Sequence, residues 1–228
     1  YGYFVVPESL TKENRRSFSW RNANPIGAFK HMKRYPQIYA LLSCIILINL
    51  AAHAVQSTWS YYTMEKFAWD EKMVGISLGF IGILLTIVQA GLLRIIIPKL
   101  GLSKSILIGL FLLTVALPLI GLVSSSGMLF AASVLYVCGG IGGPALQSLI
   151  SNLTPHNEQG QIQGGIASVI SLTAIFGPLM MSNLFAFFTK DNTSIYLPGA
   201  PFIMGGILTL AAFFIAYIYF RQKSIPSQ

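Results

Sequence analysis

Four polar side chains recur at helical spacing inside a long uncharged segment of this chain. Asn49, His53, Gln56 and Ser60 follow one another at intervals of four, three and four residues, which places them on one face of a helix. Amide, imidazole and hydroxyl groups donate and accept hydrogen bonds, and a histidine can also take up a proton near neutral pH. Because an apolar span cannot expose such a face to lipid cheaply, the spacing predicts a polar wall that faces protein or water.

His53 is the only one of the three histidines well inside a hydrophobic segment, and two interpretations of it stay open. It is either a neutral residue that hydrogen-bonds a neighbouring helix, or a residue that lines a water-filled cavity and contacts or exchanges a proton with a substrate. Further polar residues inside the segments are Gln89, Tyr136, Gln147, Ser168, Ser171 and Asn183. The predicted substrate-binding set is Asn49, His53, Gln56, Tyr136 and Ser171, with His53 as the possible proton-linked residue.

The hydrophobic segments that position these residues can be recognised because they contain no acidic residue. The seven Asp and Glu residues all lie in polar joints, and the stretches between the joints carry no charge. The stretches are Tyr35–Met64, Met73–Leu93, Ser105–Asn157, Gln159–Thr189 and Asn192–Phe220. A helix that crosses a bilayer needs about 20 apolar residues, so four stretches hold one span each. Ser105–Asn157 is long enough for two, with a turn at Ser124–Gly127.

The sequence therefore predicts an all-α membrane protein with a bundle of six transmembrane helices. The expected helices are Pro36–Tyr62, Lys72–Ile97, Ser103–Val123, Met128–Ile150, Gly160–Phe188 and Pro198–Phe220. The composition agrees, because 54% of the residues are hydrophobic and only 10% are charged. A soluble chain carries about a quarter charged residues, so a water-soluble core is excluded.

The Lys and Arg residues predict how the bundle is oriented. Twelve of the fifteen fall on one side of a six-span topology, and the positive-inside rule places that side and both chain ends in the cytoplasm. The net charge of +8 is thereby explained without nucleic acid as a partner. A basic surface for nucleic acid or anionic lipid stays an alternative for the linker and the tail.

The chain divides into four parts by composition. Residues 1–6 read as the end of a preceding transmembrane helix and residues 7–35 as a cytoplasmic linker. Residues 36–220 form the six-helix transmembrane domain and residues 221–228 a cytoplasmic tail. This division predicts that an N-terminal half of six further helices belongs to the protein.

Glycine and proline mark two candidate hinges. The pairs Gly143–Pro144 and Gly177–Pro178 interrupt the fourth and fifth spans, and a proline inside a span leaves a carbonyl unpaired and permits a kink. Gly75, Gly79 and Gly82 recur at helical spacing, which favours close helix packing. Packing alone stays the alternative for the two hinges.

No enzyme motif and no metal-ligand spacing occurs in the sequence. We therefore expect neither catalysis nor a cofactor or metal, with a proton gradient as the energy source of any active transport. The two cysteines lie within spans, and nothing in their positions predicts a disulfide bond.

Several blocks resemble the tetracycline-resistance type drug:proton antiporters of the major facilitator superfamily. The blocks are Pro7–Leu10, Arg15–Pro25, Trp59, Tyr62–Trp69, Met73–Leu78, Gly143–Gln147, Gln159–Gly164 and Phe176–Leu179. The resemblance covers nearly the whole chain. It implies the C-terminal half of a twelve-helix transporter in the bacterial inner membrane, with the substrate path between the two halves.

The chain departs from those exporters at two positions. They carry an acid on the ninth helix, where this chain has apolar residues near Leu113, and a histidine on the eighth helix, where it has Leu85; Gln89 is retained. The resemblance implies the export of an amphiphilic organic compound or drug in exchange for protons, and the departures argue against tetracycline itself. The alternatives are an importer or symporter of a metabolite with the same fold, and a structural or sensory membrane protein without a transport cycle.

Overall fold

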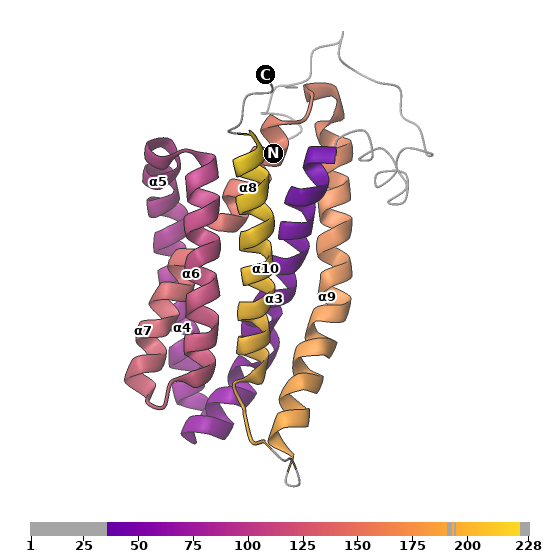
Figure 1. The fold of residues 1–228 in the computed structure, drawn as a ribbon. Helices are drawn as coiled ribbons and strands as arrows, with labels where there is room; N and C mark the ends of the chain where they lie inside the picture. Colours follow the sequence, from indigo (N-terminus) through magenta and orange to yellow (C-terminus); the bar gives the residue numbers. More distant parts are fainter. Residues whose placement is uncertain (1–35, 191–192, 194, 224–228) are drawn as a thin grey trace, which may run out of the picture.

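A computed structural model describes residues 36–190, 193 and 195–223 of the chain (Figure 1). These residues form helices and connecting turns, with no strand among them. In chain order the elements are α3 (Pro36–Phe67), α4 (Glu71–Ile87), η2 (Val88–Leu92), α5 (Leu93–Leu100), α6 (Leu102–Leu122), α7 (Ser126–Gly139), α8 (Gly142–Asn152), η3 (His156–Glu158), α9 (Gln159–Thr189) and α10 (Ala200–Lys223). The predicted helix end at residues 1–6, the predicted linker at residues 7–35 and residues 224–228 of the predicted tail lie outside the described residues.

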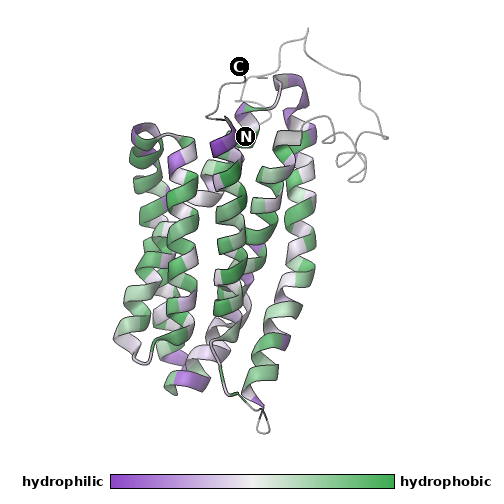
Figure 2. Cartoon of the chain, in the orientation of Figure 1, coloured by the Kyte–Doolittle hydropathy of each residue, from purple (hydrophilic) through white to green (hydrophobic). Residues whose placement is uncertain are grey.

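Six of the helical segments in the described part are long and apolar enough to cross a membrane, as predicted. Two of the six are compound: α4, η2 and α5 form the second span, and α7 and α8 form the fourth. The start of α3 and the end of α10 lie at the same end of the bundle (Figure 1). Hydrophilic residues gather at the two ends, while the helices between them are mostly hydrophobic (Figure 2).

The joint between the first two spans is set by two local signals. Ala68 has a positive φ of 50° and ends α3 in the left-handed conformation that often stops a helix. Asp70 then caps α4, because its carboxylate accepts a hydrogen bond from the backbone N–H of Met73 at 2.8 Å. The helix α3 consequently extends five residues beyond the predicted end at Tyr62.

The bundle is built around α3 and α10, which pack along each other. Helix α9 packs on α3, while α6 packs on α10 and on the α7–α8 pair (Figure 1). Only 11% of the second span is buried, compared with 33–50% of the other five. The second span therefore has much of its surface without a partner in the described part of the chain.

Glycine allows a close crossing between α6 and the start of α8. A Cβ atom on Gly109 would lie 2.6 Å from the backbone nitrogen of Gly142, and one on Gly139 would lie 2.8 Å from the Cγ of Leu113. Small residues permit such approach in lipid, where hydrophobicity does not draw helices together. By contrast, nothing lies within 4 Å of a Cβ on Gly75, Gly79 or Gly82, so the packing predicted for them has no partner here.

Side chains of α3 donate hydrogen bonds to carbonyl groups at the C-terminal end of α6. The last carbonyls of a helix have no partner within it, and here the Tyr62 hydroxyl donates to the carbonyl of Ile120 while the Lys66 ammonium donates to that of Gly121 at 2.8 Å. A cation is also favoured at a helix C-terminus by the helix dipole. These contacts fix α6 against α3 at the end of the bundle opposite to the start of α3.

The loop before α10 is tied to the same end of α3. The Tyr196 hydroxyl donates a hydrogen bond to the Glu65 carboxylate, and this bond, together with burial and the nearby negative charge, raises the pKa of Tyr196 to about 12. The neutral phenol is therefore the form that the fold stabilises.

We predict opposite effects for two Gly→Ala substitutions in helices. Gly109→Ala should destabilise the protein by about 1–3 kcal/mol, because the new methyl group meets the backbone of Gly142. Gly127→Ala, where nothing lies within 4 Å, should be neutral or stabilising by up to about 1 kcal/mol through helix propensity. Thermal unfolding of the purified protein in detergent measures both. Equal melting temperatures for the two variants would contradict the tight crossing.

Candidate functional site

The predicted polar stripe lies on a face of α3 that its neighbours leave partly open. Gln56 is exposed, and Asn49, His53 and Ser60 are half-buried. The face that packs on α10 differs, since Ala51 and Ala54 are fully buried there and approach Gly205. The four polar residues therefore share one face of a helix that is otherwise buried along much of its length.

The members of the stripe differ in how freely they can reach a ligand. The Asn49 side-chain amide donates to the carbonyl of Ile45 at 2.8 Å and keeps its amide oxygen as an acceptor. The Gln56 side chain is exposed, and its amide carries both an acceptor oxygen and an NH₂ donor. Gln56 is thus the strongest hydrogen-bonding group that this face offers to a small molecule.

His53 lies at the contact between α3 and α9. Its imidazole ring occupies the space beside Gly177, where a Cβ atom would collide with the ring carbons. The glycine is buried, and the histidine is half-buried. Both interpretations of His53 draw on this geometry, because one edge of the ring packs on a neighbouring helix while the residue keeps partial access.

Ser171 lies apart from the stripe. It is exposed on α9, and its hydroxyl donates to the carbonyl of Ala167 at 2.9 Å. Six residues separate it from Gly177, which turns it about 240° around the helix from the residue that touches α3. The structure therefore does not bring Ser171 together with Asn49, His53 and Gln56.

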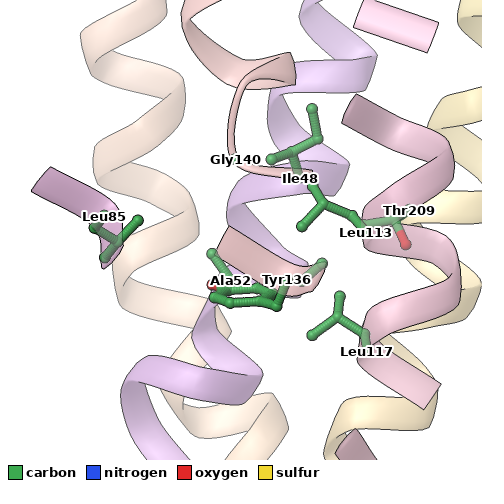
Figure 3. A pocket seen from close by; sticks show the side chains of 9 residues that line it. Ile48, Ala52, Leu85, Leu113, Leu117, Tyr136, Gly140 and Thr209 are labelled. Atoms are coloured by element: carbon green, nitrogen blue, oxygen red, sulfur yellow. The ribbon is translucent and has the colours of Figure 1, made fainter. Parts of the chain in front are cut away.

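Tyr136 lines a cavity of about 130 Å³ between α3, α4, α6, α7 and α10 (Figure 3). The other lining residues are Ile48, Ala51, Ala52, Leu85, Leu113, Leu117, Gly140 and Thr209. Its wall includes Leu85 and Leu113, and the predicted departures from the tetracycline exporters that the chain resembles lie at Leu85 and near Leu113. Sequence reasoning found Tyr136 but not the cavity, because its other residues are apolar except Thr209 and come from four other helices and the turn after α7.

The predicted interruption of the fourth span is confirmed, and it lies just before Gly143. Helix α7 ends at Gly139 and α8 begins at Gly142, with Gly140 and Ile141 in a turn between them. Pro144 falls in the first turn of α8, where its missing N–H costs no helical hydrogen bond. The helix therefore breaks at the glycines, and the proline fits the start of the next segment.

The predicted break at Gly177–Pro178 is wrong. Helix α9 runs without interruption from Gln159 to Thr189 with Pro178 inside it. A proline removes one hydrogen bond of the ladder, and neighbouring packing can hold the helix together across that gap. In this structure Gly177 provides the space for the His53 ring, which is a packing role.

The second span contains a π-helical segment, η2, that sequence reasoning did not predict. Gln89, which is exposed, lies in this segment, and the N–H of Leu93 bonds the carbonyl of Val88 five residues earlier. Such segments frequently occur at functional sites. Gln89 itself was recognised as a polar residue within a span.

Charge is absent from the middle of the described spans. The charged residues lie at the two ends, with Arg94, Lys99 and Lys104 near the end where α3 begins and Glu65, Asp70 and Glu71 at the other. No group of three or more His, Cys, Asp or Glu residues in the described part could hold a metal ion. The site therefore offers neutral hydrogen-bonding groups and apolar surface.

A double-mutant cycle separates packing from hinge motion at His53 and Gly177. We predict that Gly177→Ala destabilises the protein by about 1–3 kcal/mol, because the methyl group takes the place of the ring. His53→Ala removes the ring, so the double variant should recover stability relative to Gly177→Ala alone. Thermal unfolding in detergent measures the coupling, and additive losses would refute the packing role.

The comparisons with known proteins agree on one family. Residues 41–228 match the Major Facilitator Superfamily. The chain is 30% identical over 185 residues to the tetracycline resistance protein, class C, of Escherichia coli, which covers 81% of this chain and 46% of the relative. It is 24% identical over 231 residues to the human hippocampus abundant transcript-like protein 1, covering 93% of this chain and 46% of the relative.

A solved structure shows the same fold. The human organic anion transporter MFSD10 (TETRAN) superimposes with a TM-score of 0.77 over 94% of this chain and 53% of its own chain, at 22% identity. The chain thus spans about half the length of the curated relatives named above. The expected resemblance to the tetracycline-resistance type transporters is confirmed, and the chain belongs to the Major Facilitator Superfamily.

Proposed function

We propose that this chain is the C-terminal half of a secondary active transporter that exports an amphiphilic organic compound or drug in exchange for protons. The relatives support this proposal, because several are tetracycline resistance proteins and the chain matches about half of their length. The missing half would supply six further helices. The protein would reside in the bacterial inner membrane with both ends of this half in the cytoplasm, as the distribution of basic residues favours.

The observation that carries the proposal is the neutral polar stripe on α3. The outward surfaces of α6 and α10 present large apolar side chains such as Phe111, Leu119 and Phe214, which suit contact with lipid. The stripe instead presents Asn49 and Gln56, which suit a cavity between two halves of a transporter. Amides beside apolar surface match a cargo that has both polar and apolar parts.

The exposed second span supports the existence of a partner half. With only 11% of the span buried, its glycine face offers the close backbone approach that helix pairs use in membranes. Alternating access would then proceed by rocking of the two halves around the site. The break between α7 and α8 and the π-helical segment provide irregular backbone near the site, as is common in transporters.

One residue of this half supports a proposal for proton coupling. Among the described spans, His53 is the only Asp, Glu, His, Lys or Arg well inside the bundle. The coupling group would be His53 or a residue of the other half. We propose His53 for the part of the coupling that this chain performs.

Flux in everted membrane vesicles tests direction and coupling. With the full-length protein and an inward-acidic pH gradient, an amphiphilic dye such as ethidium should accumulate in the vesicles, and collapsing the gradient should stop it. Accumulation driven in right-side-out vesicles instead would identify an importer or symporter. No flux of any amphiphile in either orientation would favour a protein without a transport cycle.

We predict that His53→Ala lowers this flux at least about a hundredfold, the lower end of the range for a lost proton-transfer group, and flattens its pH dependence. The level of the variant in the membrane should equal that of the wild type, because the substitution only removes a half-buried ring. Unchanged flux with unchanged pH dependence would reject the role of His53 and leave coupling to the other half.

A further inference from the structure

The cavity lined by Tyr136 has a sealed floor and a partly open rim. Ala51, Leu113, Leu117 and Thr209 are 0–5% exposed and form the floor. The other five lining residues are half-buried and form the rim: Ile48, Ala52, Leu85, Tyr136 and Gly140. A small molecule or part of one can therefore enter from the side of the half-buried residues.

The chemistry of the wall restricts what can enter. Only Tyr136 and Thr209 carry polar side-chain atoms among the nine lining residues (Figure 3). The Thr209 hydroxyl already lies 3.0–3.1 Å from the carbonyls of Gly206 and Gly205. An occupant must therefore be apolar and can gain at most the hydrogen-bonding group of Tyr136, because an unpaired polar group would lose its water there.

The size of the cavity points to a single ring. A dry protein cavity of about 150 Å³ lined by aliphatic and aromatic side chains binds benzene. The cavity here is about 130 Å³, so a phenyl ring or a branched alkyl group of similar volume matches its size.

The rim connects the cavity to the polar stripe. On α3, Asn49 lies three residues before the rim residue Ala52 and Gln56 lies four residues after it, so the three residues share one face. We propose that the cavity is a binding subsite for an uncharged apolar ring of the cargo, while the polar part of the same molecule is held by Asn49 and Gln56. The inference rests on the proposed transport function and names its cargo as a compound with a small, separate ring.

The wall also offers no charged partner to an occupant. Leu85 and Leu113 both contribute carbon side chains to it. Carbon side chains at both positions remove any partner for a charge, so the subsite selects against a charged group.

A pair of matched probes tests the subsite in the purified full-length protein. Benzamide carries a ring and an amide, and acetamide carries the amide alone. Benzamide should bind at least about tenfold more tightly than acetamide, measured by the rise in melting temperature with concentration. Ala52→Leu fills the rim and should abolish this difference, whereas Ala211→Leu on the exposed face of α10 should preserve it.

Alkylation of an introduced cysteine tests ligand binding at the same site without a large substitution. In a background with Cys44→Ala and Cys138→Ala, the thiol from Ala52→Cys should react with N-ethylmaleimide, and benzamide but not acetamide should slow the reaction. The thiol from Ala211→Cys should be indifferent to both. An unreactive thiol at position 52, equal protection by both probes, or protection only by added lipid would overturn the subsite.

The failure of the subsite can be told from the failure of the transporter. If amphiphile flux persists in vesicles while benzamide gives no protection, the subsite is refuted and the transport function stands. If benzamide protects and no flux is found, the cavity binds a ring and the proposed transport is refuted.

Discussion

The structure depends on one constraint, which is that the hydrocarbon interior of a membrane offers no water to polar groups. The spans meet it by bonding their own hydroxyl groups back to the helix. Thr58 donates to Ala54 and Ser133 donates to Leu129, each four residues earlier. At the end of α6 the side chains of Tyr62 and Lys66 serve the remaining carbonyls from outside. The exposed amide of Gln56 differs, because it bonds neither to its own helix nor to the end of a neighbouring helix in the described part of the chain.

The same constraint explains why glycine matters more for contact than for motion in this half. With no hydrophobic force between helices in lipid, stability comes from close packing, and glycine permits the closest approach. Gly109 meets the start of α8, and Gly177 receives the ring of His53. The break before α8 is the exception, because there consecutive glycines end one helix and start another. Irregular backbone is tolerated at membrane depth where protein surrounds it.

The sequence predicted the elements better than the site. Charge-free stretches, polar joints and the turn at Ser124–Gly127 located all six spans, since a bilayer imposes length and polarity directly on the chain. The stripe of Asn49, His53 and Gln56 followed from helical periodicity. The π-helical segment and the continuity of α9 through Pro178 were not predictable, because both depend on what neighbouring helices supply. Ser171 was grouped with α3 by residue type alone, although helix rotation turns it away.

The position of His53 has a consequence for how a proton could act on the cargo site. The ring belongs to the stripe on α3 and also fills the space beside Gly177 on α9, so one residue joins the cargo wall to the contact between two helices. A proton on the ring adds a charge and a second N–H donor, and both need water or an acceptor. The backbone beside Gly177 is buried and offers little water to a second N–H group. Through His53, proton uptake would change the polar stripe on α3, and no carboxylate in this half would be needed for it.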